Sequence, residues 1–203
     1  MSEVKEVKNL FYRRFHRVMA PIIRAIFPLE IHGREYLTDE AVVLCPNHTN
    51  AVDPILLACA MPGSTLLRIM AKKQLMGVPV IGWLIGKLGG FGVDRGNSDI
   101  NAIKTAIRAL KDGWKLMIFP EGTRVKEGEE VDAKGGAAMI AIRSGVKMQP
   151  VYIAPNKRPF RRSKIVFGPA YAPVYTGRKG TAEEYQTNVE EIMRQVKELG
   201  ESV

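Results

Sequence analysis

The sequence has few cysteines and no long hydrophobic run, and these absences exclude several classes of protein. Only Cys45 and Cys59 occur among its 203 residues, which excludes a disulfide framework and is compatible with a reducing compartment. No stretch reaches the roughly 18 uninterrupted apolar residues of a membrane-spanning helix. The first thirty residues carry charges throughout and lack the pattern of a secretory signal.

Signatures of metal, nucleotide and nucleic-acid binding are missing as well. His16 and His32 are isolated, and no cluster of cysteine and histidine has the spacing of metal ligands. No glycine-rich loop ends in Gly-Lys-Ser/Thr, which excludes a Walker-type nucleotide site. The basic segments lack the interleaved aromatics of single-strand binders. We therefore expect no metal, no resident cofactor and no nucleic-acid partner.

Apolar residues and positive charge are both plentiful. The chain is 46% hydrophobic and 25% charged, which indicates one globular domain with a substantial core. Its net charge of +9 favours anionic partners, such as a phosphorylated substrate or an anionic bilayer surface.

Residues 1–29 predict a basic amphipathic helix, bent at Pro21. Its apolar residues recur at three- and four-residue spacing: Val7, Leu10, Phe11, Phe15, Val18, Met19, Ile22, Ile23 and Ile26. The pattern fits a helix packed on the core, but lysines and arginines between the apolar positions favour a membrane-docking segment. We therefore divide the chain into a docking segment, 1–29, and a second domain, 30–203.

Short strands alternate with helices in residues 30–203, which predicts an α/β fold. Strands are expected at 41–45, 65–71, 91–95, 115–119, 148–153 and 165–167, and helices at 54–61, 98–112, 135–144 and 181–199. Asp53, Ser98 and Thr181 are the expected N-caps of three of these helices. We expect a mixed, mostly parallel sheet flanked by helices, with the amphipathic segment at its N-terminal end.

Residues 74–90 are apolar but are broken by several glycines and a proline. The stretch is too interrupted to span a bilayer. Two interpretations stay open: a pair of short core helices, or the wall of a groove for an apolar ligand.

The polar gap between the apolar runs 41–44 and 55–60 holds His48 and Asp53. An imidazole accepts a proton near neutral pH, and a carboxylate fixes its tautomer. No serine or cysteine in this segment is an obvious nucleophile, because Cys45 fits a buried core thiol. The pair would then activate a hydroxyl of the substrate. From the spacing alone, a loop histidine with Asp53 as a helix cap is an equal alternative.

Two further clusters contain candidates for binding phosphate. Residues 119–124 (FPEGTR) place Arg124 beside a glycine and a hydroxyl, and residues 89–95 (GGFGVDR) end in Arg95. Guanidinium groups bind phosphate with two hydrogen bonds, and glycines permit close approach of the backbone. Lys73 could add a third positive group. Each cluster alone also fits an ordinary surface turn.

Four segments in this order resemble the motifs of the glycerolipid acyltransferase family. They are NHTNAVDP at 47–54, GFGVDR at 90–95, FPEGTR at 119–124 and QPVYI at 149–153. The resemblance covers most of residues 30–170. The first and third segments are highly specific together, whereas the fourth departs from the family, which often has Val-Pro where Gln149-Pro150 stands.

The resemblance implies an activity and roles for single residues. The expected reaction transfers an acyl group from acyl-CoA or acyl-carrier protein to the sn-2 hydroxyl of 1-acyl-sn-glycerol 3-phosphate (lysophosphatidic acid), which gives phosphatidic acid. His48 would be the general base, oriented by Asp53. The expected phosphate-binding residues are Lys73, Arg95, Glu121, Gly122, Thr123 and Arg124. The expected residues of the acyl-donor site and acyl groove are Leu75, Gly82, Trp83, Gly86, Pro150 and Val151.

The expected location is the cytoplasmic face of the cell membrane, as a peripheral or monotopic protein bound to an anionic surface. Two alternatives remain. A sibling acyltransferase would use glycerol 3-phosphate or another lysolipid as acceptor. A non-enzymatic, basic membrane-binding module would explain the charge but would leave His48, Asp53 and the 119–124 cluster as coincidences.

Overall fold

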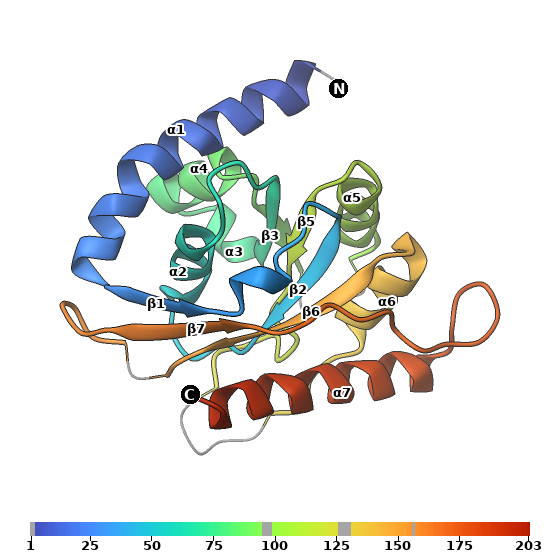
Figure 1. The fold of residues 1–203 in the computed structure, drawn as a ribbon. Helices are drawn as coiled ribbons and strands as arrows, with labels where there is room; N and C mark the ends of the chain where they lie inside the picture. Colours follow the sequence, from blue (N-terminus) through green and yellow to red (C-terminus); the bar gives the residue numbers. More distant parts are fainter. Residues whose placement is uncertain (1–2, 95–98, 126–130, 156) are drawn as a thin grey trace.

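A seven-stranded sheet with helices on both faces forms the body of the protein (Figure 1). The computed structural model describes residues 3–94, 99–125, 131–155 and 157–203. The strands are β1 (Leu29–His32), β2 (Val42–Pro46), β3 (Leu67–Lys72), β4 (Phe91–Val93), β5 (Lys115–Met117), β6 (Lys147–Ile153) and β7 (Ser163–Phe167). The helices are α1 (Glu3–Ile26), α2 (Asp53–Ala60), α3 (Lys73–Met76), α4 (Pro79–Lys87), α5 (Ile100–Lys111), α6 (Gly136–Ser144) and α7 (Ala182–Glu201), with a 3-10 turn at Arg34–Tyr36.

The strand order is β1-β7-β6-β2-β5-β3-β4. Only β6 and β7 pair in the antiparallel sense, and the other five neighbouring pairs are parallel. This arrangement confirms the predicted mixed, mostly parallel sheet. Strand β2 lies at its centre with all five residues buried, as expected for a parallel strand covered on both faces.

Successive residues of β2 contribute to opposite cores, because side chains alternate across a strand. Val42 and Leu44 pack with α1 and α2, whereas Val43 and Cys45 pack with α5, α6 and α7. Cys45 is fully buried, and burial raises the pKa of its thiol, so it is the core residue that the sequence predicts.

Helix α1 packs on α2 and contributes to the core. Tyr12 and Ala20 are buried, at 5% and 2% exposure. Tyr12 donates to the carbonyl of Ala58, Arg24 donates to that of Cys59, and the His16 ring lies 3.1 Å from the Met61 carbonyl. These side chains thus satisfy carbonyls at the C-terminal end of α2, which the helix itself leaves unpaired.

Other positions of α1 are exposed and apolar, at Leu10, Val18 and Ile22. One helix therefore provides a packed face and an exposed apolar face. Within the described ranges, no helix is long and apolar enough to cross a membrane. The division at residue 29 and the docking role of the first segment stay predictions.

Several local predictions are corrected by the structure. Asp53 lies in the first turn of α2, and its cap position is occupied by Val52; the Asp53 carboxylate bonds backwards, to the loop before the helix. Ser98, the predicted cap of α5, lies outside the described residues, and Asp99 takes this role by accepting from the Ala102 N–H at 2.9 Å. Strand β1 was not predicted.

Other local predictions are confirmed. Residues 74–90 are mainly the helix pair α3 and α4, but α3 has no buried residue, so the helices are present without the core position that one interpretation gave them. Thr181 and Glu184 form the predicted capping box at the start of α7.

Candidate active site

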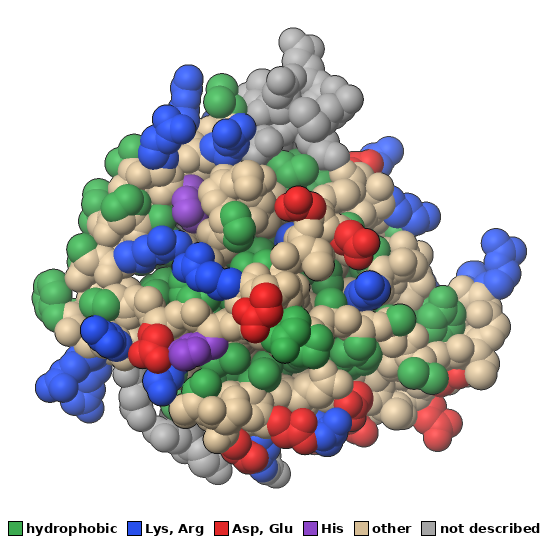
Figure 2. All heavy atoms as spheres, viewed as in Figure 1, with side chains coloured by type: hydrophobic (Ala, Val, Ile, Leu, Met, Phe, Trp, Pro, Cys, Tyr) green, Lys and Arg blue, Asp and Glu red, His purple; other side chains and the backbone are tan. Residues whose placement is uncertain are grey.

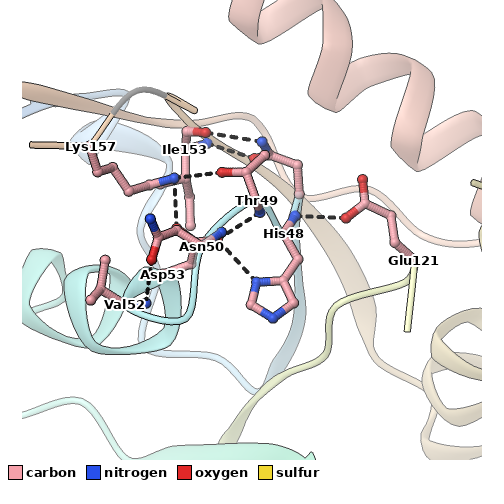
Figure 3. A network of polar contacts seen from close by, with 9 residues as sticks. His48, Thr49, Asn50, Val52, Asp53, Glu121, Ile153 and Lys157 are labelled. Carbon is pink, nitrogen blue, oxygen red and sulfur yellow. Dashed lines mark hydrogen bonds and ion pairs between the residues drawn. The ribbon is translucent and has the colours of Figure 1, made fainter. Parts of the chain in front are cut away.

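The candidate active site lies where three neighbouring central strands end (Figure 3). His48 follows β2, Glu121 follows β5, and Lys157 follows β6. These strands run parallel, so their carboxyl ends meet at the same edge, where α/β proteins commonly place reactive groups. The sheet order thus brings together side chains that are more than 100 residues apart.

The backbone around His48 is fixed from both sides. The side-chain amide of Asn47 donates to the Ile153 carbonyl at 3.0 Å and accepts from the Ile153 N–H at 2.7 Å. These bonds extend the pairing of β2 with β6. The His48 N–H donates to Glu121 Oε2 at 2.7 Å, and the His48 carbonyl accepts from the Val125 N–H at 2.8 Å. Little freedom remains at the Cα that carries the imidazole.

Asp53 orients the His48 ring. Its Oδ2 lies 3.0 Å from His48 Nδ1 and also accepts the backbone N–H groups of Thr49 and Asn50, at 2.8 and 2.7 Å. Burial works to raise the pKa of the Asp53 carboxyl, but hydrogen bonds from His48 and Lys157 outweigh it and hold this pKa below its ordinary value. The carboxylate is therefore charged and fixed.

The His48 ring also contacts Phe119, and its second nitrogen, Nε2, is not used in the contact with Asp53. The two ring centroids lie 4.1 Å apart, and the His48 side chain is 12% exposed. Nε2 points away from the Asp53 network (Figure 3). A ring that is oriented through Nδ1, with Nε2 directed away, has the geometry of a general base. The structure contradicts the cap role of Asp53 in the loop-histidine alternative, and the catalytic role of the pair stays a prediction.

Lys157 is part of the site, and the sequence reasoning missed it. Its Nζ lies 2.7 Å from Asp53 Oδ1 and donates to Thr49 Oγ1 at 2.7 Å. The side chains of Lys157 and Asp53 are both 0% exposed. In the sequence, Lys157 is one of five cations in the loop 156–164, and only the order of β2 and β6 in the sheet would have distinguished it.

Glu121 turns toward His48. Burial raises the pKa of its carboxyl to about 7; the bond from the His48 N–H opposes this rise, whereas the negative charge of Asp53 adds to it. The side chain thus holds the loop that carries His48, and its predicted contact with phosphate stays a prediction.

A cavity of about 310 Å³ brings the second and third sequence clusters together. Val93 and Asp94 line it from one side, and Phe119, Pro120 and Gly122 from another. Its other walls are largely apolar: Met70, Ile103, Ile118, Met139 and Ile140.

Three of the predicted phosphate ligands lie at the surface. Lys73, Thr123 and Arg124 are exposed. Lys73 borders the second cluster, because a Cβ on Gly92 would lie 3.1 Å from the Lys73 Cα. Arg95 lies outside the described residues. The phosphate role of these residues stays a prediction.

The residues predicted for the acyl-donor site and groove occupy separate parts of the fold. Pro150 and Val151 are buried in β6, whereas Leu75 and Trp83 are exposed on α3 and α4. Gly82 is packed against α3, since an added Cβ would lie 2.2 Å from the Met76 carbonyl oxygen. An added Cβ on Gly86 would meet no atom within 4 Å. The groove stays a prediction, and only Gly86 has room for a larger side chain.

Comparison with known proteins gives a consistent result. A family model described as Acyltransferase matches residues 28–154. A protein named 1-acyl-sn-glycerol-3-phosphate acyltransferase from Bacillus subtilis (strain 168) is 30% identical over 177 residues, which cover 84% of this chain and 87% of the relative. A lyso-ornithine lipid O-acyltransferase from Pseudomonas aeruginosa is 31% identical over 132 residues, 64% of this chain and 49% of the relative.

A solved structure shares the fold. It is the 1-acyl-sn-glycerophosphate (LPA) acyltransferase PlsC from Thermotoga maritima, with a TM-score of 0.70 and 24% identity, covering 98% of this chain and 84% of that one. The chain spans 41 to 54% of the length of six other curated relatives, which are longer proteins from plants and Streptococcus pneumoniae.

Proposed function

The chain belongs to the acyltransferase family, and we propose that it is a 1-acyl-sn-glycerol-3-phosphate acyltransferase. It would move a fatty acyl group from acyl-CoA or acyl-carrier protein to the sn-2 hydroxyl of lysophosphatidic acid and form phosphatidic acid. The observation that carries this proposal is the contact of His48 Nδ1 with the buried Asp53 carboxylate at 3.0 Å, with Nε2 directed away from it.

Among the residues that the structure describes, the site offers a base but no side-chain nucleophile, so the substrate hydroxyl would be the nucleophile. Nε2 of His48 takes the proton of the sn-2 hydroxyl while the oxygen attacks the thioester carbonyl. The C–S bond then breaks, and the imidazolium returns the proton to the leaving thiolate. Asp53 stabilises the imidazolium in between, as a carboxylate does in other His–Asp pairs. Cys45 is buried in the core, so its thiol is not accessible as a nucleophile, and the substrate hydroxyl attacks the thioester directly.

The acceptor phosphate would bind at the exposed cations. Arg124 follows Phe119 by five residues in the chain, and the Phe119 ring contacts His48. A phosphate held by Arg124, Thr123 and the Gly122 backbone would therefore lie near the base. Arg95 of the second cluster and Lys73, which borders that cluster, are the further candidates.

A surface along α1 supports the proposed membrane partner. We define the docking surface as Val18, Ile22 and Ile26 of α1 together with Phe160, which is 77% exposed. The Phe160 N–H donates to the Ile26 carbonyl at 2.6 Å, so the loop and the helix end adjoin. Figure 2 shows green apolar and blue basic side chains beside one another over α1.

The two segments that form this docking surface also carry exposed cations. Arg13, Arg14 and Arg17 on α1 and Arg158, Arg161 and Arg162 in the loop are exposed. This pattern suits the anionic, cytoplasmic face of a cell membrane, with the protein peripheral or monotopic. Ile22→Asp should reduce sedimentation with vesicles that contain phosphatidylglycerol. Unchanged sedimentation would contradict the docking surface.

Product analysis tests the proposed reaction. Incubation with labelled lysophosphatidic acid and either donor should yield labelled phosphatidic acid. Absence of product with both donors would refute the proposal.

A second candidate is an acyltransferase for another lysolipid or for glycerol 3-phosphate. The relative named lyso-ornithine lipid O-acyltransferase supports an acceptor that carries no phosphate. A parallel assay with lyso-ornithine lipid separates the two. Preference for that acceptor would replace the first candidate and would argue against a phosphate role for Arg124.

A further inference from the structure

Burial of the Lys157 ammonium is unfavourable by itself, and its contacts account for its position. Its side chain is fully buried, and a buried ammonium costs several kcal/mol unless it is paired and hydrogen-bonded. The neighbouring cations Arg158, Arg161 and Arg162 are exposed. Of this basic loop, Lys157 turns inward, and its Nζ reaches Asp53 Oδ1 and Thr49 Oγ1, each at 2.7 Å.

We propose that Lys157 is a positioning residue that locks the Asp53 carboxylate in place and offsets its negative charge beside the His48 imidazole. The proposal rests on the function proposed above for its kinetic test, but not for its spectroscopic test. Lys157 would act without contacting the substrate, because its side chain is 0% exposed.

The two oxygens of the Asp53 carboxylate have different partners. Oδ2 accepts from His48 Nδ1 and from the N–H groups of Thr49 and Asn50, whereas Oδ1 faces Lys157. With both oxygens held, the carboxylate cannot rotate away from the ring. The bond from Lys157 to Thr49 Oγ1 also fixes the loop that separates His48 from Asp53.

Lys157 also brings a positive charge to the buried carboxylate. A buried carboxylate 3.0 Å from an imidazole favours the imidazolium, which cannot act as a base. The ammonium on the far oxygen offsets that negative charge. Burial lowers the pKa of Lys157, and Asp53 opposes this change. A further titratable group near the pair is Glu121, from the loop after β5, which accepts from the His48 N–H and whose pKa, raised mainly by burial, owes part of its rise to Asp53.

The test removes the charge and keeps the length of the side chain. In Lys157→Met, the imidazole titration of His48, followed by NMR in the full chain, should move to higher pH by about half to one pH unit. The chain has three histidines, and His48→Ala assigns the resonance. Lys179→Met, which removes an exposed cation, is the matched control and should leave the titration unchanged.

Kinetics give a second readout. The acidic limb of the pH profile of kcat/KM should move in the same direction in Lys157→Met, kcat should fall about tenfold or more, and KM should change little. Lys157→Arg, which retains the charge, should keep the acidic limb near that of the wild type. An unmoved limb and an unmoved NMR titration in Lys157→Met would overturn the proposal.

Melting temperatures provide a third test, which still applies if Lys157→Met folds too poorly for kinetics. Lys157→Met should lower the melting temperature more in the wild type than in Asp53→Asn, because the amide needs no counter-charge. Equal losses in both backgrounds would overturn the proposal. Wild-type protein that forms no product would refute the proposed function, but the NMR and unfolding results would still decide the role of Lys157.

Discussion

The two halves of the candidate site differ in how firmly the fold holds them. Around Asp53, each carboxylate oxygen has a donor within 3.0 Å, and the whole group is buried. The predicted phosphate ligands Lys73, Thr123 and Arg124 extend from exposed positions instead.

The difference indicates a division of tasks. The base and its orienter are arranged before any substrate binds, so no ordering cost falls on the chemical step. Exposed cations lose side-chain freedom only on binding, which makes the acceptor affinity weaker and easier to alter. Changes in the buried half should therefore act on kcat, and changes in the exposed half on KM.

The largest effect is expected for Asp53→Asn. An amide cannot accept from His48, two backbone N–H groups and Lys157 as a carboxylate does, and it does not stabilise the imidazolium. We expect kcat to fall by about 10⁴-fold, by analogy with other His–Asp pairs, with KM little changed. Steady-state kinetics measure both. Asp132→Asn, at an exposed position, is the control. A main effect on KM would remove the proposed distinction between the halves.

Arg124→Ala should act mainly on binding. Loss of a charge-assisted bond to phosphate, worth about 1.5–3 kcal/mol, should raise KM for lysophosphatidic acid roughly 10- to 100-fold. The same variant should change little with a monoacylglycerol acceptor, which lacks the phosphate. Arg143→Ala, an exposed arginine of α6, controls for charge alone. Equal losses with both acceptors would show that Arg124 does not bind the phosphate.

Selectivity for acyl chain length should distinguish two apolar regions. Gly86→Leu fills open space beside α4, whereas Ile103→Phe narrows the cavity next to Phe119. If residues 75–88 line the acyl groove, Gly86→Leu should shift the selectivity toward shorter acyl donors. We expect a change of a few-fold, below the roughly 10-fold discrimination that one methylene can provide. Competition between donors of different length measures this. A shift in Ile103→Phe alone would place the groove in the cavity.

The smallest effect is expected at Glu121, on stability. Its pKa is raised to about 7 from 4.5, so the folded state binds more protons than the unfolded state between these values, and stability falls as pH rises through this window. Glu121→Gln should flatten that fall relative to the wild type. Melting temperatures at pH 5 and pH 7.5 test this. An equal fall in the variant would assign the pH dependence to other groups.

The fold was predictable where the pattern was strong. The buried run of β2 and the capping box at Thr181 have clear signals, and both are present. Strand β1 was missed because it is four residues long, lies at the sheet edge and contains two polar residues. The cap of α5 was displaced by one residue, from Ser98 to Asp99, because both side chains can serve as N-caps.

The site was predictable in part, for a physical reason. His48 and Asp53 are five residues apart, so a local turn can join them, and the sequence shows this directly. Lys157 is 104 residues from Asp53 in the chain, and only the pairing of β2 with β6 brings it there. Local spacing cannot distinguish it from the four other cations of its loop.

The most direct test of the central claim compares the wild type with His48→Ala in a single assay. Both are incubated with labelled lysophosphatidic acid and acyl-CoA or acyl-carrier protein, and labelled phosphatidic acid is measured after equal folding is verified by circular dichroism. We expect product from the wild type and a loss of at least about 10³-fold in kcat for the variant, because no other side chain replaces the base. Full acyl transfer by His48→Ala would contradict the account.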